Sequence, residues 1–270
     1  MSVVAMIARH VVREAVRSRV LHGATLLALG AALAAPIAGR LTAGQDVRVV
    51  KDLCLAAIHL AGLFVAVFMG IQLVAREIER RSVDVVLSKP VRRLQFILGQ
   101  YAGLVATLAL CLAGWAAAMY VVLVAGASWW GGDTGLAPAQ PAPVVDPALL
   151  QAVFLIFVQL AVVAAAALCL STLVSPALAV VSICGLWVIG HFSAELRNLD
   201  DVIDSPLAAS LAAGLSYVLP DLASFDVKTA VVHGQPVTAA YLALTTTSGA
   251  AYILAFLVLA VAVFARRDLT

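Results

Sequence analysis

Six long apolar stretches dominate the sequence, and they decide the solvent in which the chain folds. Each stretch lacks Asp, Glu, Lys and Arg, and each approaches or exceeds the ~20 residues that a helix needs to cross the hydrocarbon of a bilayer. The six stretches cover residues 21–39, 53–75, 96–127, 149–174, 177–194 and 237–265. The sequence therefore predicts an all-α integral membrane protein with six transmembrane helices.

The composition points to the same solvent. Hydrophobic residues make up 63% of the 270 residues and charged residues 12%, whereas charged residues make up about 25% of a soluble domain. A net charge of +2 is too small to suggest nucleic-acid binding, so no such partner is expected. The cysteines lie in apolar runs without metal-ligand or C-x-x-C spacing, so neither a disulfide framework nor a metal site is expected. They are Cys54, Cys111, Cys169 and Cys184.

The distribution of charge predicts the orientation. With the N-terminus inside, the inner segments hold 12 of the 17 basic residues and 5 of the 15 acidic residues, a net charge of +7, and the outer segments have a net charge of −5. Because Lys and Arg are enriched on the cytoplasmic side of membrane proteins, we expect both termini to lie inside. We expect the chain to form one multi-pass domain, residues 1–270, and its location to be a bacterial inner (cytoplasmic) membrane.

Two segments outside the six stretches have a recognisable character. In residues 1–20, Arg9, Arg13 and Arg17 recur every four residues opposite an apolar face, which predicts an interfacial amphipathic helix whose basic side meets anionic lipid or a partner. The same arginines and the following apolar run also resemble a signal peptide, although the amphipathic pattern favours retention. In the outer segment 195–236, residues 207–219 are too few to span, so we expect a re-entrant or interfacial helix before the last span.

Few residues in the spans could carry chemistry. His59 is the ionisable side chain that lies well inside a predicted span, and it either bonds a neighbouring helix or contacts a substrate. Four consecutive hydroxyl residues in the last span either bond helix backbone or line a polar path. They are Thr245, Thr246, Thr247 and Ser248. The sequence contains no P-loop motif, so we expect no ATP hydrolysis and no catalytic residue in this chain.

The inner loop, residues 76–95, is the most informative polar segment. Its charges alternate in sign, which favours a solvated helix, yet it also contains the apolar run 85–87. An apolar patch surrounded by charge is typical of a docking surface for a cytosolic protein, and a loop that lies back on the bilayer would show the same pattern.

Three short motifs in order resemble one family. The inner loop carries Glu77, Glu79, Leu87-Ser88-Lys89-Pro90, Arg93 and Gly99; the outer segment carries Tyr217-Val218-Leu219-Pro220-Asp221-Leu222 with Phe225-Asp226; and the chain ends in Phe264-Ala265-Arg266-Arg267-Asp268. Together with six spans, these motifs resemble the permease subunits of ABC-2-type transporters, most closely the branch of multicopper-enzyme-maturation permeases such as the one serving nitrous-oxide reductase. The chain departs from that pattern at Arg81-Ser82, where Gly-Thr is usual, at Gln100, where Lys is usual, and at Asp221, where Asn is common.

The resemblance implies a fold, a function and partners. The N-terminal helix would be a connecting helix, and the inner loop would hold a coupling helix seated in a separate ABC ATPase subunit, which would bind ATP and Mg²⁺. Two ATPases and two permeases, most simply a homodimer, would form an exporter, with room for a periplasmic partner. The residues implied in coupling are Glu77, Glu79, Arg80, Arg81, Asp84, Val86, Lys89 and Arg93.

Two other functions are compatible with the sequence. A membrane scaffold or assembly factor that transports nothing could recruit a cytosolic protein through the same inner loop. A secondary carrier is disfavoured, because the spans contain no carboxylate and proton-coupled carriers usually use such groups. The substrate itself is not encoded in any motif; the apolar spans suit a lipid-like cargo and ordinary helix packing equally well.

Overall fold

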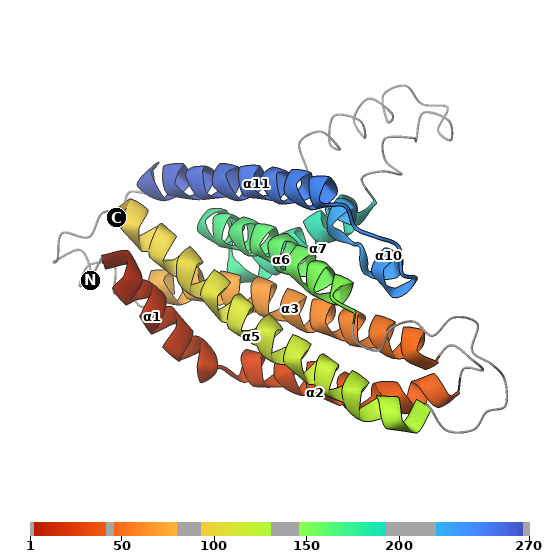
Figure 1. Cartoon of the computed structure of the whole chain (residues 1–270). Helices are drawn as coiled ribbons and strands as arrows, with labels where there is room; N and C mark the ends of the chain where they lie inside the picture. The colour runs from red at the N-terminus through yellow and green to blue at the C-terminus, as the bar shows by residue number, and fades with distance from the viewer. Residues whose placement is uncertain (1–2, 42–45, 80–92, 131–145, 193–219, 267–270) are drawn as a thin grey trace, which may run out of the picture.

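The structure, a computed structural model of the chain, describes residues 3–41, 46–79, 93–130, 146–192 and 220–266. Within these ranges every regular element is a helix (Figure 1). In chain order they are α1 Val3–Val16, α2 Arg19–Arg40, α3 Asp46–Glu79, α5 Arg93–Trp130, α6 Ala148–Leu173, α7 Pro176–His191, the 3-10 helix η2 Ala223–Phe225, α10 Lys228–Val232 and α11 Ala239–Arg266. The prediction of an all-helical protein is thus confirmed for the described residues.

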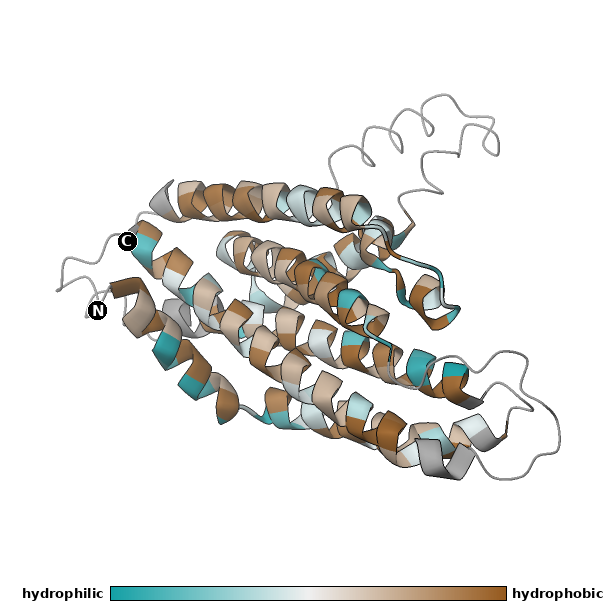
Figure 2. Cartoon of the chain, in the orientation of Figure 1, coloured by the Kyte–Doolittle hydropathy of each residue, from teal (hydrophilic) through white to brown (hydrophobic). Residues whose placement is uncertain are grey.

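Among the described residues, five helices are long and apolar enough to cross a membrane. They contain the candidate spans Arg19–Gly39, Val47–Leu73, Leu94–Gly126, Ala148–Leu173 and Ala239–Phe264. Five of the six predicted stretches therefore coincide with a helix of sufficient length. Along these helices the middle turns are apolar, and hydrophilic residues gather on α1 and near helix ends (Figure 2).

The predicted fifth span is shorter than expected. Residues 177–194 correspond to α7, which has 16 residues and a length of about 24 Å at 1.5 Å per residue. A tight turn precedes it: α6 ends at Leu173, Ser175 is extended, and Pro176 occupies the first turn of α7, where a missing N–H costs nothing. Because α6 has 26 residues, α7 stops about 15 Å short of the level at which α6 begins.

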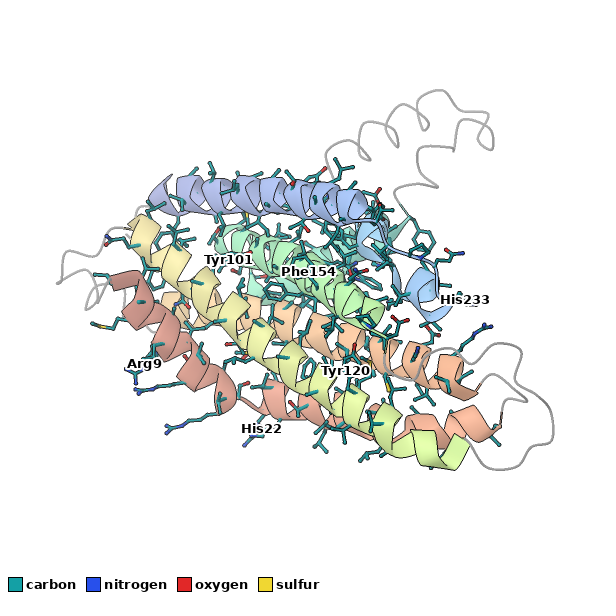
Figure 3. The ribbon with its side chains drawn as sticks, in the orientation of Figure 1. Arg9, His22, Tyr101, Tyr120, Phe154 and His233 are labelled. Atoms are coloured by element: carbon teal, nitrogen blue, oxygen red, sulfur yellow. The ribbon has the colours of Figure 1, made fainter. Side chains whose placement is uncertain are left out.

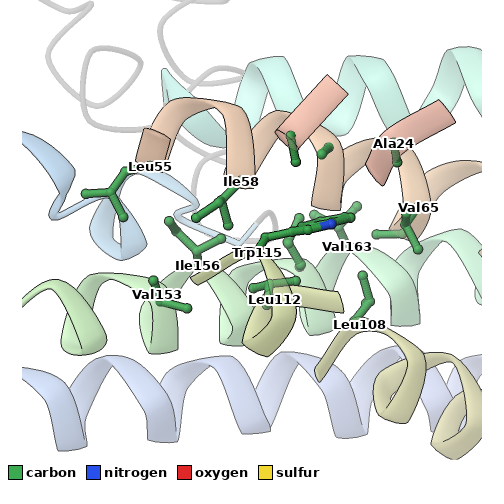
Figure 4. Close-up of a cluster of buried hydrophobic side chains, with 14 of the residues drawn as sticks. Ala24, Leu55, Ile58, Val65, Leu108, Leu112, Trp115, Val153, Ile156 and Val163 are labelled. Atoms are coloured by element: carbon green, nitrogen blue, oxygen red, sulfur yellow. The ribbon is translucent and has the colours of Figure 1, made fainter. Parts of the chain in front are cut away.

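Helix α6 forms the centre of the bundle. It packs against α3 on one side and α11 on the other (Figure 1), and 19 of its 26 residues are buried. Next to it, Trp115 of α5 lies among aliphatic side chains of α3, α5 and α6, including Ile58, Leu112, Ile156 and Val163 (Figure 4). Such interdigitated packing fixes helix positions where lipid supplies no hydrophobic driving force between helices.

The N-terminal helix is seated against α5. The two glycines of the G-x-x-x-G motif in α5 face it: a Cβ on Gly99 would lie 2.8 Å from Ile7 Cβ, and one on Gly103 would lie 2.6 Å from Val11 Cβ. The motif therefore allows close approach, as expected of small residues in membrane helices, and the partner is α1 of the same chain. The apolar face of α1 is buried there, while Arg9 projects away from the bundle (Figure 3).

The close packing of α1 against the glycines of α5 can be tested with two alanine substitutions in α5. Gly103→Ala should lower the free energy of unfolding by about 1–3 kcal/mol, because the new Cβ overlaps Val11 and the Ala8 carbonyl. Gly114→Ala is the matched control, since no atom lies within 4 Å of a Cβ at that position. Unfolding in mixed detergent micelles measures both, and an equal loss in the two variants would contradict the close packing of α1.

Candidate functional site

The end of the bundle that carries the predicted coupling residues is only partly described. Helix α3 ends at Glu79 and α5 begins at Arg93, so both helices lead into the predicted coupling loop. Glu77, Glu79 and Arg93 lie in these terminal turns, and their side chains lie outside the described part of the structure. The other predicted coupling residues fall in the undescribed range 80–92, so their role stays a prediction. They are Arg80, Arg81, Asp84, Val86 and Lys89.

The other helix ends place the remaining inner segments at the same end of the bundle. The rings of Phe96, near the start of α5, and Phe264, near the end of α11, stack with centroids 6.1 Å apart. Helix α1 also begins beside the first turns of α5. The start of α1, the end of α3, the start of α5 and the end of α11 therefore share one end (Figure 1).

His59 lies in a polar contact that joins distant parts of the chain. Its side chain is 5% exposed, and its Nδ1 atom lies 2.7 Å from Nζ of Lys228, which is 169 residues away in sequence. Because an ammonium group can only donate, Nδ1 accepts this hydrogen bond and the proton of the neutral imidazole sits on Nε2. Asp226 Oδ2 lies 3.2 Å from the same ammonium. His59 is therefore accompanied by a cation and a carboxylate.

Two aromatic rings of α7 complete this cluster. The centroid of His59 lies 6.2 Å from that of Trp187 and 6.1 Å from that of His191, and the last two rings are 4.4 Å apart. Among the described residues, His59 Nε2 and Trp187 Nε1 are buried without a hydrogen-bond partner. No group of three or more metal-ligating side chains forms in the parts of the chain that the structure describes. This cluster of His59, Trp187, His191, Asp226 and Lys228 is called the polar cluster below.

Residues 220–232 cover the end of α7 and are called the cap segment below. The Leu222 N–H donates to the carbonyl of Gly190 at 2.9 Å, and Gln159 Nε2 donates to the carbonyl of Leu222 at 3.1 Å. Gln159 is fully buried, 11 residues or about 16 Å along α6 from Ala148. The cap segment therefore occupies the level of the bundle that α7 is too short to reach.

Apolar contacts fasten the cap segment to the core. The side chains of Leu222, Phe225, Val231 and Val232 are almost fully buried. Phe225 lies against α11, where a Cβ on Gly249 would be 3.2 Å from its ring. The Tyr241 hydroxyl of α11 also donates to the carbonyl of Ser224. The cap segment thus connects α3, α6, α7 and α11 at the end of the bundle opposite to the coupling residues.

The four hydroxyl residues of α11 bond mainly to their own helix. Thr246 and Thr247 donate to the carbonyls of Leu242 and Ala243, each at 2.7 Å, and Ser248 donates to the carbonyl of Thr245 at 2.8 Å. Thr245 is buried and Thr247 is exposed. Because α6 lies between α3 and α11, the structure does not bring these hydroxyls together with His59.

The sequence patterns did not indicate the partners of His59. Lys228 and Asp226 lie in a segment expected to be outside the spans, and Gln159 is a single amide in an apolar stretch. Trp187 and His191 are four residues apart, a spacing that puts two rings on one face of a helix. That spacing is the one signal that could have indicated an aromatic face near the end of α7.

A comparison with protein families covers almost the whole chain. Residues 5–269 match the model described as ABC-2 family transporter protein. The chain belongs to this family. The ABC-2 membership and the five long apolar helices make the chain a multi-pass membrane component of an ABC transporter, and such permeases generally work with an ABC ATPase. A comparison with curated proteins found no match.

The docking of the cap segment can be tested by removing its largest apolar contact. Phe225 is 1% exposed, so Phe225→Ala should lower the free energy of unfolding by about 3 kcal/mol, because the space it leaves is not refilled. Phe154→Ala is the matched control, since Phe154 of α6 is 41% exposed and lies on the surface of the bundle (Figure 3). A loss for Phe225→Ala no larger than that of the control, in the same micelle titration, would show that the segment is not packed on the core.

Proposed function

We propose that this chain is the permease subunit of an ATP-driven ABC exporter that moves a substrate outward across a bacterial inner membrane. The observation that carries the proposal is the family match over residues 5–269. The sequence contains no P-loop, so the energy would come from a separate ATPase subunit that binds ATP and Mg²⁺. The functional unit would contain two permeases, most simply two copies of this chain, and two ATPases.

The proposed topology has six passes with both termini inside. Five of them would be the long helices, and α7 together with the cap segment would make the sixth. The charge asymmetry supports this orientation, since it places a net charge of +7 on the inner segments. The end of the bundle shared by α1, the end of α3, the start of α5 and the end of α11 would then face the cytosol, and the cap segment would face outward.

Coupling would run through the loop between α3 and α5. ATP binding would close the two ATPases, and this motion would push on the loop held in a cleft of each ATPase. Because α3 and α5 continue from that loop into the bundle as helices of 34 and 38 residues, they could transmit the displacement across the membrane. His59 and the hydroxyls of residues 245–248 remain separate candidates for contact with substrate.

The substrate class comes from resemblance only. The branch of permeases that serve multicopper-enzyme maturation would imply a small species used in assembling metalloenzymes outside the cytosol. Sequence similarity at the level of short motifs does not fix a substrate. The proposal is therefore independent of which cargo is moved.

A charge reversal in the last turn of α3 tests the coupling. Glu79→Arg should abolish the ATPase activity that the permease stimulates in a reconstituted complex, because it places a cation in a docking surface arranged for an anion, while the protein stays inserted. Asp52→Arg is the matched control, since it makes the same change at an exposed position near the other end of α3.

Two results would contradict this coupling assignment. The first is full stimulated activity in Glu79→Arg and in several other variants of residues 76–93. The second is the absence of any ATPase that associates with the chain, which would favour a membrane scaffold instead.

A further inference from the structure

The cap segment is held by few polar contacts, and one of them depends on protonation. The Leu222 N–H donates to the Gly190 carbonyl, and the Leu222 carbonyl accepts a hydrogen bond from Gln159 Nε2. Neither of these bonds involves a titratable group. The bond from Lys228 to His59 Nδ1, at 2.7 Å, requires a lone pair on that nitrogen. A proton on Nδ1 would remove the acceptor and leave two cations within hydrogen-bonding distance.

The surroundings of His59 offer little compensation for a second positive charge. The charged or titratable groups that act on it are Lys228, Asp226 and His191. Asp226 is the one carboxylate among them, and it already pairs with Lys228 at 3.2 Å. Among the other helices that pack on α3, α6 contains no charged residue. The charged residue of α5 is its first residue, Arg93, and the charged residues of α2 are its first and last residues, Arg19 and Arg40.

The contact of the cap segment with α3 therefore depends on the charge of one buried side chain, that of His59. His59 lies 13 residues, or about 20 Å, along α3 from Asp46, so a proton would reach it from the end of the bundle that the cap segment covers. His59 Nε2 has no partner among the described residues, so no second hydrogen bond to protein holds the ring in its present position.

We propose that the cap segment is a proton-sensitive closure: it stays seated on α3 while His59 is neutral, and protonation of His59 releases it. The role of this closure in transport rests on the proposed function. In that role, the cap segment would close the outer end of the substrate path and would open more readily when the outside is acidic. The release itself is a property of this chain and does not require an ATPase.

Hydrogen exchange on the full chain in lipid nanodiscs, without ATPase, tests the proposal. After correction for the intrinsic rates, amides of the cap segment should exchange at least tenfold faster at pH 5 than at pH 7.5. Amides of α6, which is buried throughout its central turns, serve as the internal reference and should not change. Equal protection of the cap segment at both pH values would overturn the proposal, and so would loss of protection in α6, which would mean general unfolding.

Three variants separate His59 from other groups. His59→Asn offers Lys228 a carbonyl oxygen near the Nδ1 position but cannot be protonated, so the cap segment should stay protected at pH 5. Lys228→Met removes the donor, and exchange should be fast at both pH values. His233→Asn is the matched control, because His233 is exposed and bonds the carbonyl of Thr229; it should behave as the wild type. A pH response that persists in His59→Asn would overturn the proposal.

A disulfide can confirm that the exchange reports release of the segment. A Cβ on Gly190 would lie 2.9 Å from Leu222 Cγ and 2.9 Å from the carbonyl oxygen of Pro220. A sulfur at the Leu222 Cγ position would be within bonding reach of a cysteine at Gly190, and because the new Cβ crowds the Pro220 backbone, the reduced double variant is the reference for the oxidised one. In a chain without the four native cysteines, the pair Gly190→Cys and Leu222→Cys should hold the segment in place when oxidised. Oxidation should abolish the pH response and reduction should restore it; a response unaffected by oxidation would contradict a release of the cap segment.

Discussion

Hydrocarbon offers no hydrogen-bond partner to a peptide group, and this constraint shapes the whole chain. Long helices satisfy their own backbone, so five described helices are able to cross it. The cap segment consists of the short helices η2 and α10 and a few non-helical residues, and its Leu222 lies beside the middle of α6. The peptide groups outside these helices need partners inside the protein. Gln159 supplies one to Leu222, and the last turn of α7 supplies another through Gly190. A buried unpaired carbonyl would cost about 1–3 kcal/mol.

The cap segment can lie at this position because α7 is short. Because α7 ends at His191, it leaves a level of the bundle to be filled, and the cap segment fills it with Leu222 and Phe225. The polar cluster forms at this junction because His59 faces the place where α7 stops. At the end of the bundle that carries the predicted coupling residues, α3, α5 and α11 are continuous long helices. At the opposite end the cap segment packs between the long helices at the level that α7 does not reach.

Much of this fold could be predicted because helix length and apolarity are local properties. The turn at Ser175 and Pro176 and the close approach at Gly99 and Gly103 also have local signatures, although the sequence did not reveal that α1 is the partner of those glycines. The contact between His59 and Lys228 could not be predicted, because 169 residues separate them and tertiary packing alone brings them together. The end of α7 at His191 could not be predicted either, because the apolar run continues through Phe192 and the contact of Leu222 with Gly190 comes from a distant part of the chain.

The central claim is that the loop between α3 and α5 faces the cytosol, where an ATPase can bind it. The most direct measurement introduces Ser82→Cys into a chain without native cysteines and labels it with a membrane-impermeant maleimide in oriented vesicles. The account predicts labelling in inverted inner-membrane vesicles and none in sealed right-side-out vesicles. Labelling from the outside of intact right-side-out vesicles would contradict it.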